Sequence, residues 1–277
     1  MDAAINVIVE NTTPASPLIG EYGFSAQLLI DNHNILFDTG SNHALFKNST
    51  TLGIDLSLVE EIVVSHGHYD HTGAVMPFLK KYGGRKIYAH SGIFAHRLIS
   101  RTGGQMIDIG CSFAYQEAVD AGADFIFTDT FTEIHPGIYL TGQIPRLTGY
   151  EDVGGNFLYE KDGQFHKDLL PDDMAMLIDH PEGLIIISGC SHSGMVNTLE
   201  YCRQKTGRSK VLAYIGGTHL INASRERLDK TIDAVNTYQV QKLIVGHCTG
   251  FYAAAELYNR LGRQRVIKMD AGLKYIF

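Results

Sequence analysis

The sequence predicts a mixed chain of strands and helices in which helices cover β-sheets, and three observations lead to this fold class. Short apolar runs rich in Val, Ile and Leu recur along the 277 residues, as expected of strands. Segments with apolar residues at three- and four-residue intervals lie between several of these runs, as expected of amphipathic helices. Strands and helices alternate in the C-terminal third, which favours helix-covered sheets over an all-β sandwich.

The N-terminal part is rich in strands with short connections. The expected strands are residues 5–9, 25–31, 34–37, 61–64, 85–88 and 125–127. A turn at residues 32–34 is expected to join two of them as a β-hairpin. Helical spacing predicts one helix over 72–81 and another near 115–121.

The C-terminal part contains seven further expected strands and three longer helices. The strands are residues 137–140, 156–159, 174–178, 184–187, 210–215, 242–245 and 265–269. The helices are residues 194–204, 224–237 and 250–261. The second of these helices is expected to start at a cap provided by Asn222 or Ser224.

Chain length bounds the domain organisation. At 277 residues the chain is close to the size at which a single core stops growing, so one domain over 1–277 is expected. Between about 84 and 164 the rhythm of elements is less regular and Gly-rich breaks occur, which indicates an inserted α/β segment. No period of 20 to 50 residues repeats, which argues against solenoids and propellers.

Charge and composition exclude several classes of protein. The formal net charge is −7 and no run of lysine or arginine occurs, which argues against a nucleic-acid partner. The N-terminus lacks the pattern of a signal peptide, and no apolar stretch approaches ~18 residues, so we expect a cytoplasmic protein with no membrane partner. The four cysteines form no CxxC pair, so neither a disulfide framework nor a zinc ribbon is expected.

The stretch "SHGHYDHTG" at residues 65–73 carries the clearest chemical signal. It contains His66, His68, Asp70 and His71 within six residues, directly after an apolar run. Imidazole nitrogens and carboxylate oxygens are the usual ligands of zinc and similar divalent ions. We therefore predict a metal-binding loop at the corner between a strand and a helix.

Three later apolar runs each end at glycine followed closely by histidine. They are "LIIISGCSH", which ends in His192, "VLAYIGGTH", which ends in His219, and "KLIVGHC", which contains His247 just before its last residue. Ligands of α/β sheets gather at the carboxyl ends of strands, so these histidines are expected to be distant partners of the first cluster. One or two metal ions can be accommodated, since a catalytic metal usually takes three protein ligands and an open position.

The predicted metal site favours hydrolysis or group transfer on an ester or a phosphate. Paired metals can hold a bridging hydroxide and polarise the electrophile. In "ILFDTG", Asp38 either forms a simple Asx-turn or orients a metal-bound histidine or the metal loop through a hydrogen bond. Both readings of Asp38 are about equally supported by the residues.

"FDTG", "SHGHYDHTG" and the strand-end histidines together resemble the metallo-β-lactamase superfamily, whose signature is HxHxDH. The resemblance covers nearly the whole chain and implies an α+β fold, a four-layer αββα sandwich. It implies that His66 and His68 bind a first metal. It also implies that Asp70, His71 and His247 bind a second one, and Asp70 is the expected catalytic residue.

A narrower resemblance is to the archaeal dihydropteroate-synthase-like enzymes of methanopterin synthesis and their bacterial relatives. It is carried by "GEYGFSAQLLID", "TGQIPRLTGYED", "SGCSHSGMVNTL", "GGTHL" and "GHCTG". Those enzymes join a dihydropterin pyrophosphate to 4-(β-D-ribofuranosyl)aminobenzene 5'-phosphate. The resemblance implies a small phosphorylated or pterin-like substrate, with Arg146 and Glu151 in a loop that binds it. From the residues alone, Arg146 is either a phosphate ligand or a solvated charge of the loop.

Two departures from the superfamily pattern affect the metal ligands. Many members have an aspartate that bridges the metals where this chain has Cys190, which is either a thiolate ligand or a small buried residue. A histidine usual upstream of that position has no clear counterpart, so His192 is expected to substitute for it, and His219 is a further candidate.

The sequence therefore predicts a metal-dependent hydrolase or transferase that binds one or two divalent ions. Zinc is the expected metal, with manganese, iron or magnesium as alternatives. An iron-type redox protein and a non-enzymatic metal sensor are the competing readings, and assembly into a homo-oligomer is left open. The redox reading is disfavoured because the diiron proteins with this fold have a glutamate in place of His68 and a flavin partner domain. This sequence shows neither feature.

Overall fold

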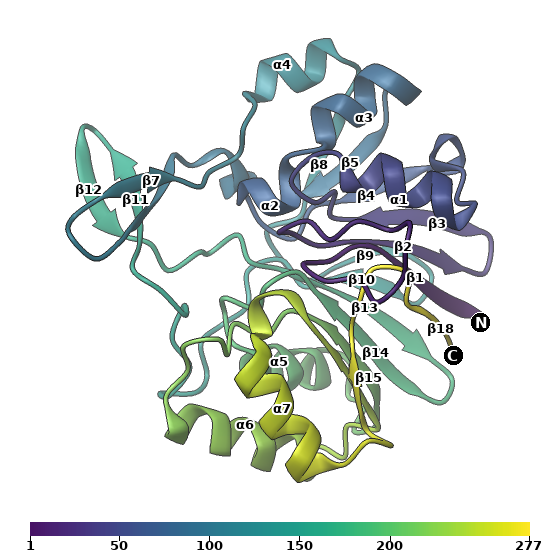
Figure 1. Cartoon of the computed structure of the whole chain (residues 1–277), viewed down its shortest axis with the longest axis vertical. Coiled ribbons are helices and arrows are strands. Elements are labelled where there is room, and N and C mark those ends of the chain that lie inside the picture. Colours follow the sequence, from purple (N-terminus) through teal and green to yellow (C-terminus); the bar gives the residue numbers. More distant parts are fainter. The chain divides into compact units, whose positions relative to one another are not determined.

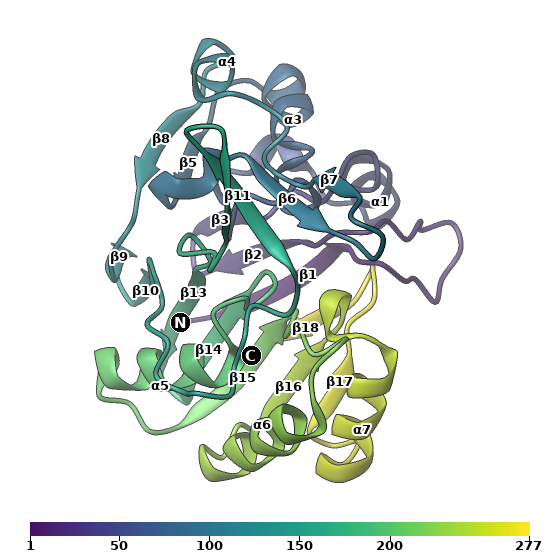
Figure 2. The same ribbon diagram turned by 90° about the vertical axis from the view of Figure 1, so that its left-hand side faces the viewer.

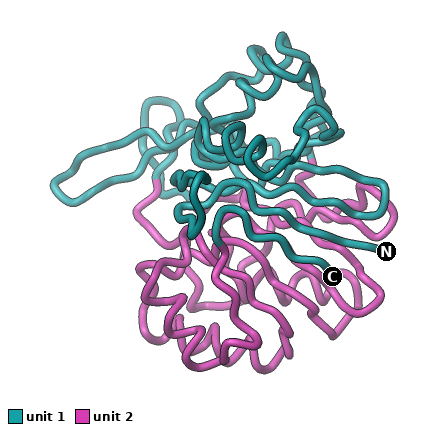
Figure 3. Tube along the Cα trace, turned by 45° about the vertical axis from the view of Figure 1, so that its right-hand side comes forward, with its two compact units in different colours: residues 1–127, 158–168, 270–277 teal, residues 128–157, 169–269 magenta.

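The computed structural model describes residues 1–277 and divides the chain into two compact units. Unit 1 consists of residues 1–127, 158–168 and 270–277, and unit 2 consists of residues 128–157 and 169–269 (Figure 3). The chain therefore passes between the units several times. Residues 84–164, the expected insertion, contribute to both units, and the expectation of one domain with an insertion stays a prediction.

Unit 1 is built on a seven-stranded mixed sheet with the order β18-β1-β2-β3-β4-β5-β8. Its strands are β1 Ala3–Val9, β2 Ser25–Ile30, β3 His33–Phe37, β4 Glu61–Val63, β5 Lys86–Ala89, β8 Asp124–Phe127 and β18 Lys274–Ile276. Pairing is antiparallel from β18 to β3 and parallel from β3 to β8. The predicted hairpin is confirmed, but its turn lies at residues 31 and 32, where Asp31 adopts a φ of 49°.

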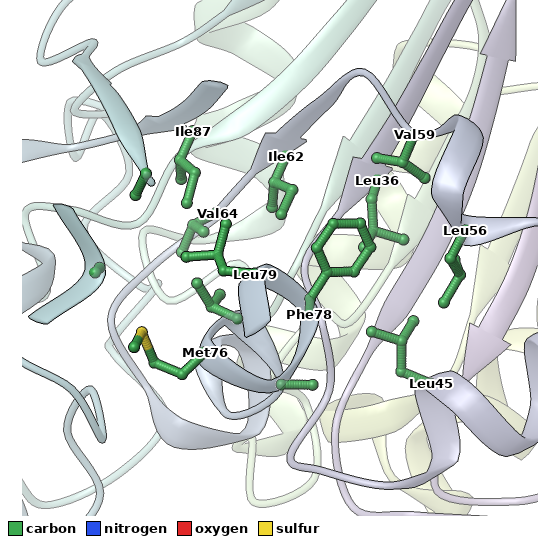
Figure 4. Packing of buried hydrophobic residues seen from close by; sticks show 14 of the residues in the cluster. Leu36, Leu45, Leu56, Val59, Ile62, Val64, Met76, Phe78, Leu79 and Ile87 are labelled. Atoms are coloured by element: carbon green, nitrogen blue, oxygen red, sulfur yellow. The ribbon is translucent and has the colours of Figure 1, made fainter. Parts of the chain in front are cut away.

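Helices α1 Ala44–Leu52 and α3 Val75–Tyr82 pack their apolar side chains on this sheet. Figure 4 shows Phe78 and Leu79 of α3 among side chains of the sheet, including Ile62. The predicted helix over 72–81 corresponds to α3, which begins three residues later because a separate helix, α2 Tyr69–Thr72, precedes it. Helix α4 Tyr115–Asp120 agrees with the expectation.

A second, four-stranded sheet has the order β12-β11-β6-β7. Strands β11, β6 and β7 of this sheet are labelled in Figure 2. Its strands are β6 Arg97–Ser100, β7 Met106–Asp108, β11 Phe157–Lys161 and β12 Gln164–Lys167. Strands β11 and β12 form one antiparallel hairpin, and β6 and β7 form another. The two hairpins are joined by a hydrogen bond from the Glu160 amide to the His96 carbonyl at 3.0 Å. Residues 158–168 thereby return to unit 1.

Unit 2 contains another seven-stranded mixed sheet, with the order β17-β16-β15-β14-β13-β10-β9. Its strands are β9 Thr132–His135, β10 Ile138–Leu140, β13 Ala175–His180, β14 Gly183–Ser188, β15 Val211–Gly216, β16 Lys242–Val245 and β17 Val266–Lys268. Strands β14 to β17 are parallel, and β14 and β15 are buried over their whole length. Their continuous apolar sequences are typical of such buried parallel strands.

Helices α5 Met195–Thr206, α6 Arg225–Thr237 and α7 Phe251–Leu261 connect the parallel strands of unit 2 (Figure 1). All three agree with the predicted helices. Helix α6 starts at Ser224, whose hydroxyl accepts a hydrogen bond from the Arg227 amide at 3.1 Å, so Ser224 provides the predicted cap.

Several elements were not predicted. They include helix α1 and strands β6, β7, β9, β12 and β18. The sequence of β12, "QFHK", is exposed at all four positions and shows no alternation of apolar residues. None of the helices is both long and apolar enough to cross a membrane.

Candidate functional site

The histidine-rich loop lies in unit 1 between β4 and helix α2, as the sequence predicts. β4 ends at Val63, and His68 is the N-cap residue of α2. All four donors are buried: His66 and His71 are fully inaccessible, and His68 and Asp70 are each 5% exposed. Such burial of polar rings is expected only where they have polar or metal partners.

The donors of this loop face one another at short distances. The His66 Nε2 and His68 Nδ1 atoms are 3.0 Å apart, and the rings of His66 and His71 have centroids 4.2 Å apart. The His71 Nε2 atom lies 3.6 Å from Asp70 Oδ2. Two nitrogens bound to one tetrahedral zinc ion are about 3.3 Å apart. The donor set of unit 1 therefore fits a divalent metal in both chemistry and spacing.

Asp38 is fully buried beneath this loop and organises it. Its Oδ1 atom accepts a hydrogen bond from the Ser65 amide at 2.7 Å. Its Oδ2 atom accepts one from the Ser65 hydroxyl at 2.7 Å and pairs with His71 Nδ1 at 2.6 Å. With the Nδ1 proton directed to Asp38, the lone pair of His71 is on Nε2. These contacts are those expected of a residue that orients a ligand.

Gly67 and Arg97 form a support for the loop that the sequence did not reveal. A Cβ atom at Gly67 would lie inside van der Waals contact of the Ile93 carbonyl and 2.6 Å from Arg97 Nη1. Arg97 is itself buried, and its Nε atom donates to Asp168 Oδ2 at 2.8 Å. The ion pair joins residues 71 positions apart, so no local pattern indicates it.

The other predicted ligands lie in unit 2, just after strands β14, β15 and β16. These strands are parallel neighbours, so their carboxyl ends meet at one edge of the sheet. Potential ligand atoms of Cys190, His192 and His219 lie within 4.8 Å of one another. The same holds for Cys190, His247 and Cys248. The structure therefore brings together the histidines of three distant strand ends, with Cys190 common to both groups.

His192 is held in a defined orientation within this cluster. Its Nδ1 atom lies 2.8 Å from the Val153 carbonyl, which requires the proton on Nδ1 and leaves the lone pair on Nε2. The rings of His192 and His219 have centroids 4.3 Å apart, and Phe157 packs edge-on against both. A backbone carbonyl that fixes the tautomer is typical of histidines that bind metals.

The loop that carries His192 is braced by Arg146 and Asp173. Arg146 Nη2 donates to the carbonyls of His192 and Leu169, at 2.9 Å each. Burial lowers the pKa of the Arg146 guanidinium. Asp173 accepts a hydrogen bond from the Ser193 amide at 2.8 Å, and burial raises the pKa of its carboxyl to about 6. Arg146 thus holds the His192 loop in place, and its role in substrate binding stays a prediction.

Glu151, the second residue predicted to bind substrate, lies at the start of helix α5 and contacts its first turn. Its two carboxylate oxygens accept hydrogen bonds from the amides of Val196 and Asn197, at 2.9 and 2.8 Å. These amides belong to the first turn of α5, where a negative charge is favourable. Burial nevertheless raises the pKa of the Glu151 carboxyl. Glu151 thus stabilises the start of α5, and its role in substrate binding stays a prediction.

The predicted site residues therefore form two sets. His66, His68, Asp70, His71 and Asp38 lie together in unit 1, and Cys190, His192, His219 and His247 lie together in unit 2. That both sets bind the same ion or ions stays a prediction of the sequence. Cys248, which directly follows His247 in "GHC" and is expected from the sequence to be a packing residue, lies beside Cys190 and His247.

Comparisons with known proteins identify what the chain is similar to. Residues 22–192 match the family model of the metallo-beta-lactamase superfamily. A curated relative from Methanocaldococcus jannaschii, 7,8-dihydropterin-6-methyl-4-(beta-D-ribofuranosyl)-aminobenzene-5'-phosphate synthase, is 30% identical over 269 residues. That similarity covers 91% of this chain and 92% of the relative.

Two further proteins are similar over nearly their whole length. An uncharacterised protein of the same archaeon is 31% identical over 254 residues, which cover 91% of this chain and 93% of that protein. The crystal structure of a metal-dependent hydrolase of the beta-lactamase superfamily superposes with a TM-score of 0.83 at 28% identity. The superposition covers 99% of this chain and 98% of the hydrolase chain. The α+β fold class predicted from the sequence is therefore confirmed.

Proposed function

The chain belongs to the metallo-beta-lactamase superfamily, and from that premise we propose that it is a metal-dependent enzyme that hydrolyses or transfers a group of a small phosphorylated or pterin-like substrate. The observation that carries this proposal is the buried donor set of residues 66–71, with Asp38 fixing the tautomer of His71. The name of the M. jannaschii relative supports a pterin-like and phosphorylated substrate.

We propose His66, His68, Asp70 and His71 as metal ligands in unit 1, and His192 and His247 as metal ligands in unit 2. Cys190 and His219 are further candidates. A bound divalent ion would activate water or stabilise a phosphate leaving group. One or two ions, with zinc preferred, agree with imidazole and carboxylate donors.

The protein's own residues would prepare this chemistry in three ways. Asp38 and the Val153 carbonyl hold the Nδ1 protons of His71 and His192, so that each ring presents Nε2 to its ligand. Asp70, 5% exposed, is the proposed catalytic carboxylate and would accept a proton as well as bind metal. Arg146, at the His192 loop, is proposed to bind a substrate phosphate.

A substrate panel tests this function directly. Phosphodiesters, lactones and dihydropterin pyrophosphates, the last with an aminobenzene ribose phosphate as acceptor, are offered to the metal-loaded protein and to His68→Ala. We expect turnover of at least one phosphorylated or pterin-like compound, a loss of ~100-fold or more in His68→Ala, and restoration of activity by metal after chelation. Equal behaviour of wild type and His68→Ala on every compound would instead favour a metal sensor.

A further inference from the structure

We propose that Cys248 acts with Cys190 and His247 as a two-thiolate, one-imidazole binding site for a thiophilic divalent ion such as zinc. The inference rests on the proposed function, which requires a bound metal. It deepens that function because it names the ligands of one ion. It assigns a metal-binding role to Cys248, which directly follows the proposed ligand His247.

The geometry of unit 2 brings these three side chains to one point. The two sulfur atoms and a His247 ring nitrogen all lie within 4.8 Å of one another. In a tetrahedral zinc site, two thiolates bound at ~2.3 Å lie about 3.8 Å apart. The three donors therefore lie close to the spacing that a single ion requires. The positive φ of 50° at His247 keeps the turn between β16 and α7 tight.

The surroundings of Cys248 hold its sulfur atom next to Cys190. The His219 amide donates a hydrogen bond to Cys248 Sγ at 3.3 Å. The Cys248 thiol donates to the Cys190 carbonyl at 3.4 Å, so the two residues are in direct contact. A Cβ atom at Gly217 would lie 2.5 Å from the sulfur, so glycine at this position leaves room for Cys248.

Charge balance supports two thiolates in particular. Cys190 is 3% exposed, Cys248 4% and His247 5%, so an ion here would be almost completely removed from water. A buried dication is stable only when neighbouring charges neutralise it. Two thiolates and one neutral imidazole carry a charge of about −2, which cancels that of the ion. Cys190 thereby supplies the negative charge that an aspartate gives at this position in many relatives of the superfamily.

Cobalt spectroscopy on the full chain tests the inference. The apo-protein is titrated with Co²⁺, and sulfur-to-cobalt charge transfer is followed in the near ultraviolet. We expect such a band in the wild type, a fall of about half in Cys248→Ser and its disappearance in Cys190→Ser/Cys248→Ser, since each sulfur ligand contributes. Cys202→Ser, which removes a fully buried thiol of α5, is the matched control and should retain the band.

A second measurement needs no variant that could fail to fold. X-ray absorption at the zinc edge of the wild type loaded with one Zn²⁺ per chain should show two sulfur neighbours at ~2.3 Å. An unchanged cobalt band in Cys248→Ser, or a zinc spectrum with no more than one sulfur neighbour, would overturn the inference. The band should persist in His66→Ala, so failure of the catalytic proposal and failure of this one can be told apart.

Discussion

Replacing Asp38 with alanine is expected to lower the free energy of unfolding by about 3–5 kcal/mol and to weaken metal binding by about 10- to 100-fold. The Ser65 amide, the Ser65 hydroxyl and His71 Nδ1 all lose their acceptor, and all three are buried. An unsatisfied buried donor costs about 1–3 kcal/mol, and neighbouring losses are not fully additive. Urea denaturation and competition with a metal indicator measure the two effects.

Asp162→Ala is the matched control for Asp38→Ala. Asp38 adopts a φ of 54° and Asp162 a φ of 53°, but Asp162 lies exposed in the turn between β11 and β12. Its replacement isolates the cost of placing alanine in the left-handed region, about 1 kcal/mol, and should leave metal affinity unchanged. The account of Asp38 would be wrong if the two variants lost equal stability and bound metal equally well.

Gly67→Ala is expected to be the second most damaging change. The added methyl group would overlap the Ile93 carbonyl and lie 2.6 Å from Arg97 Nη1, and the backbone of Ile93 cannot move as a flexible side chain can. Overpacking of this kind costs about 1–3 kcal/mol or more. Because Gly67 separates His66 from His68, relaxation of the loop should also displace these two rings and reduce metal occupancy.

Gly149→Ala provides the control for this change, since a Cβ atom there meets no atom within 4 Å. Its free energy of unfolding should stay within about 0.5 kcal/mol of the wild type. Thermal unfolding of the apo-proteins separates the packing cost from the loss of metal. A Gly67→Ala protein as stable and as fully loaded with metal as Gly149→Ala would refute the proposed packing.

The sequence predicted the elements that carry the site better than it predicted the supports around them. The strand that ends before His66 and the three strands that end before His192, His219 and His247 were all found, because each is a continuous apolar run ending at a polar cluster. Strand β12 was missed because it is exposed on both faces, and exposed strands have no apolar pattern.

Contacts between residues far apart in sequence account for the rest. The pair of Arg97 and Asp168 stabilises unit 1 across 71 positions, and Glu151 caps α5 across about 45. A charge in a loop gives no indication of its partner, so the contact of Glu151 with α5 could not be predicted from the sequence. The contact between Cys190 and Cys248 is of the same kind, since the two residues are 58 positions apart.

The most direct test of the central claim is the metal content of three proteins purified without added metal. The wild type is compared by elemental analysis with two variants. His68→Ala removes one proposed ligand of unit 1, and His247→Ala removes one of unit 2. If both donor sets hold catalytic metal, the wild type contains at least one divalent ion per chain and each variant contains less. A wild type with less than one ion per chain, or variants that retain the full content of the wild type, would contradict the claim.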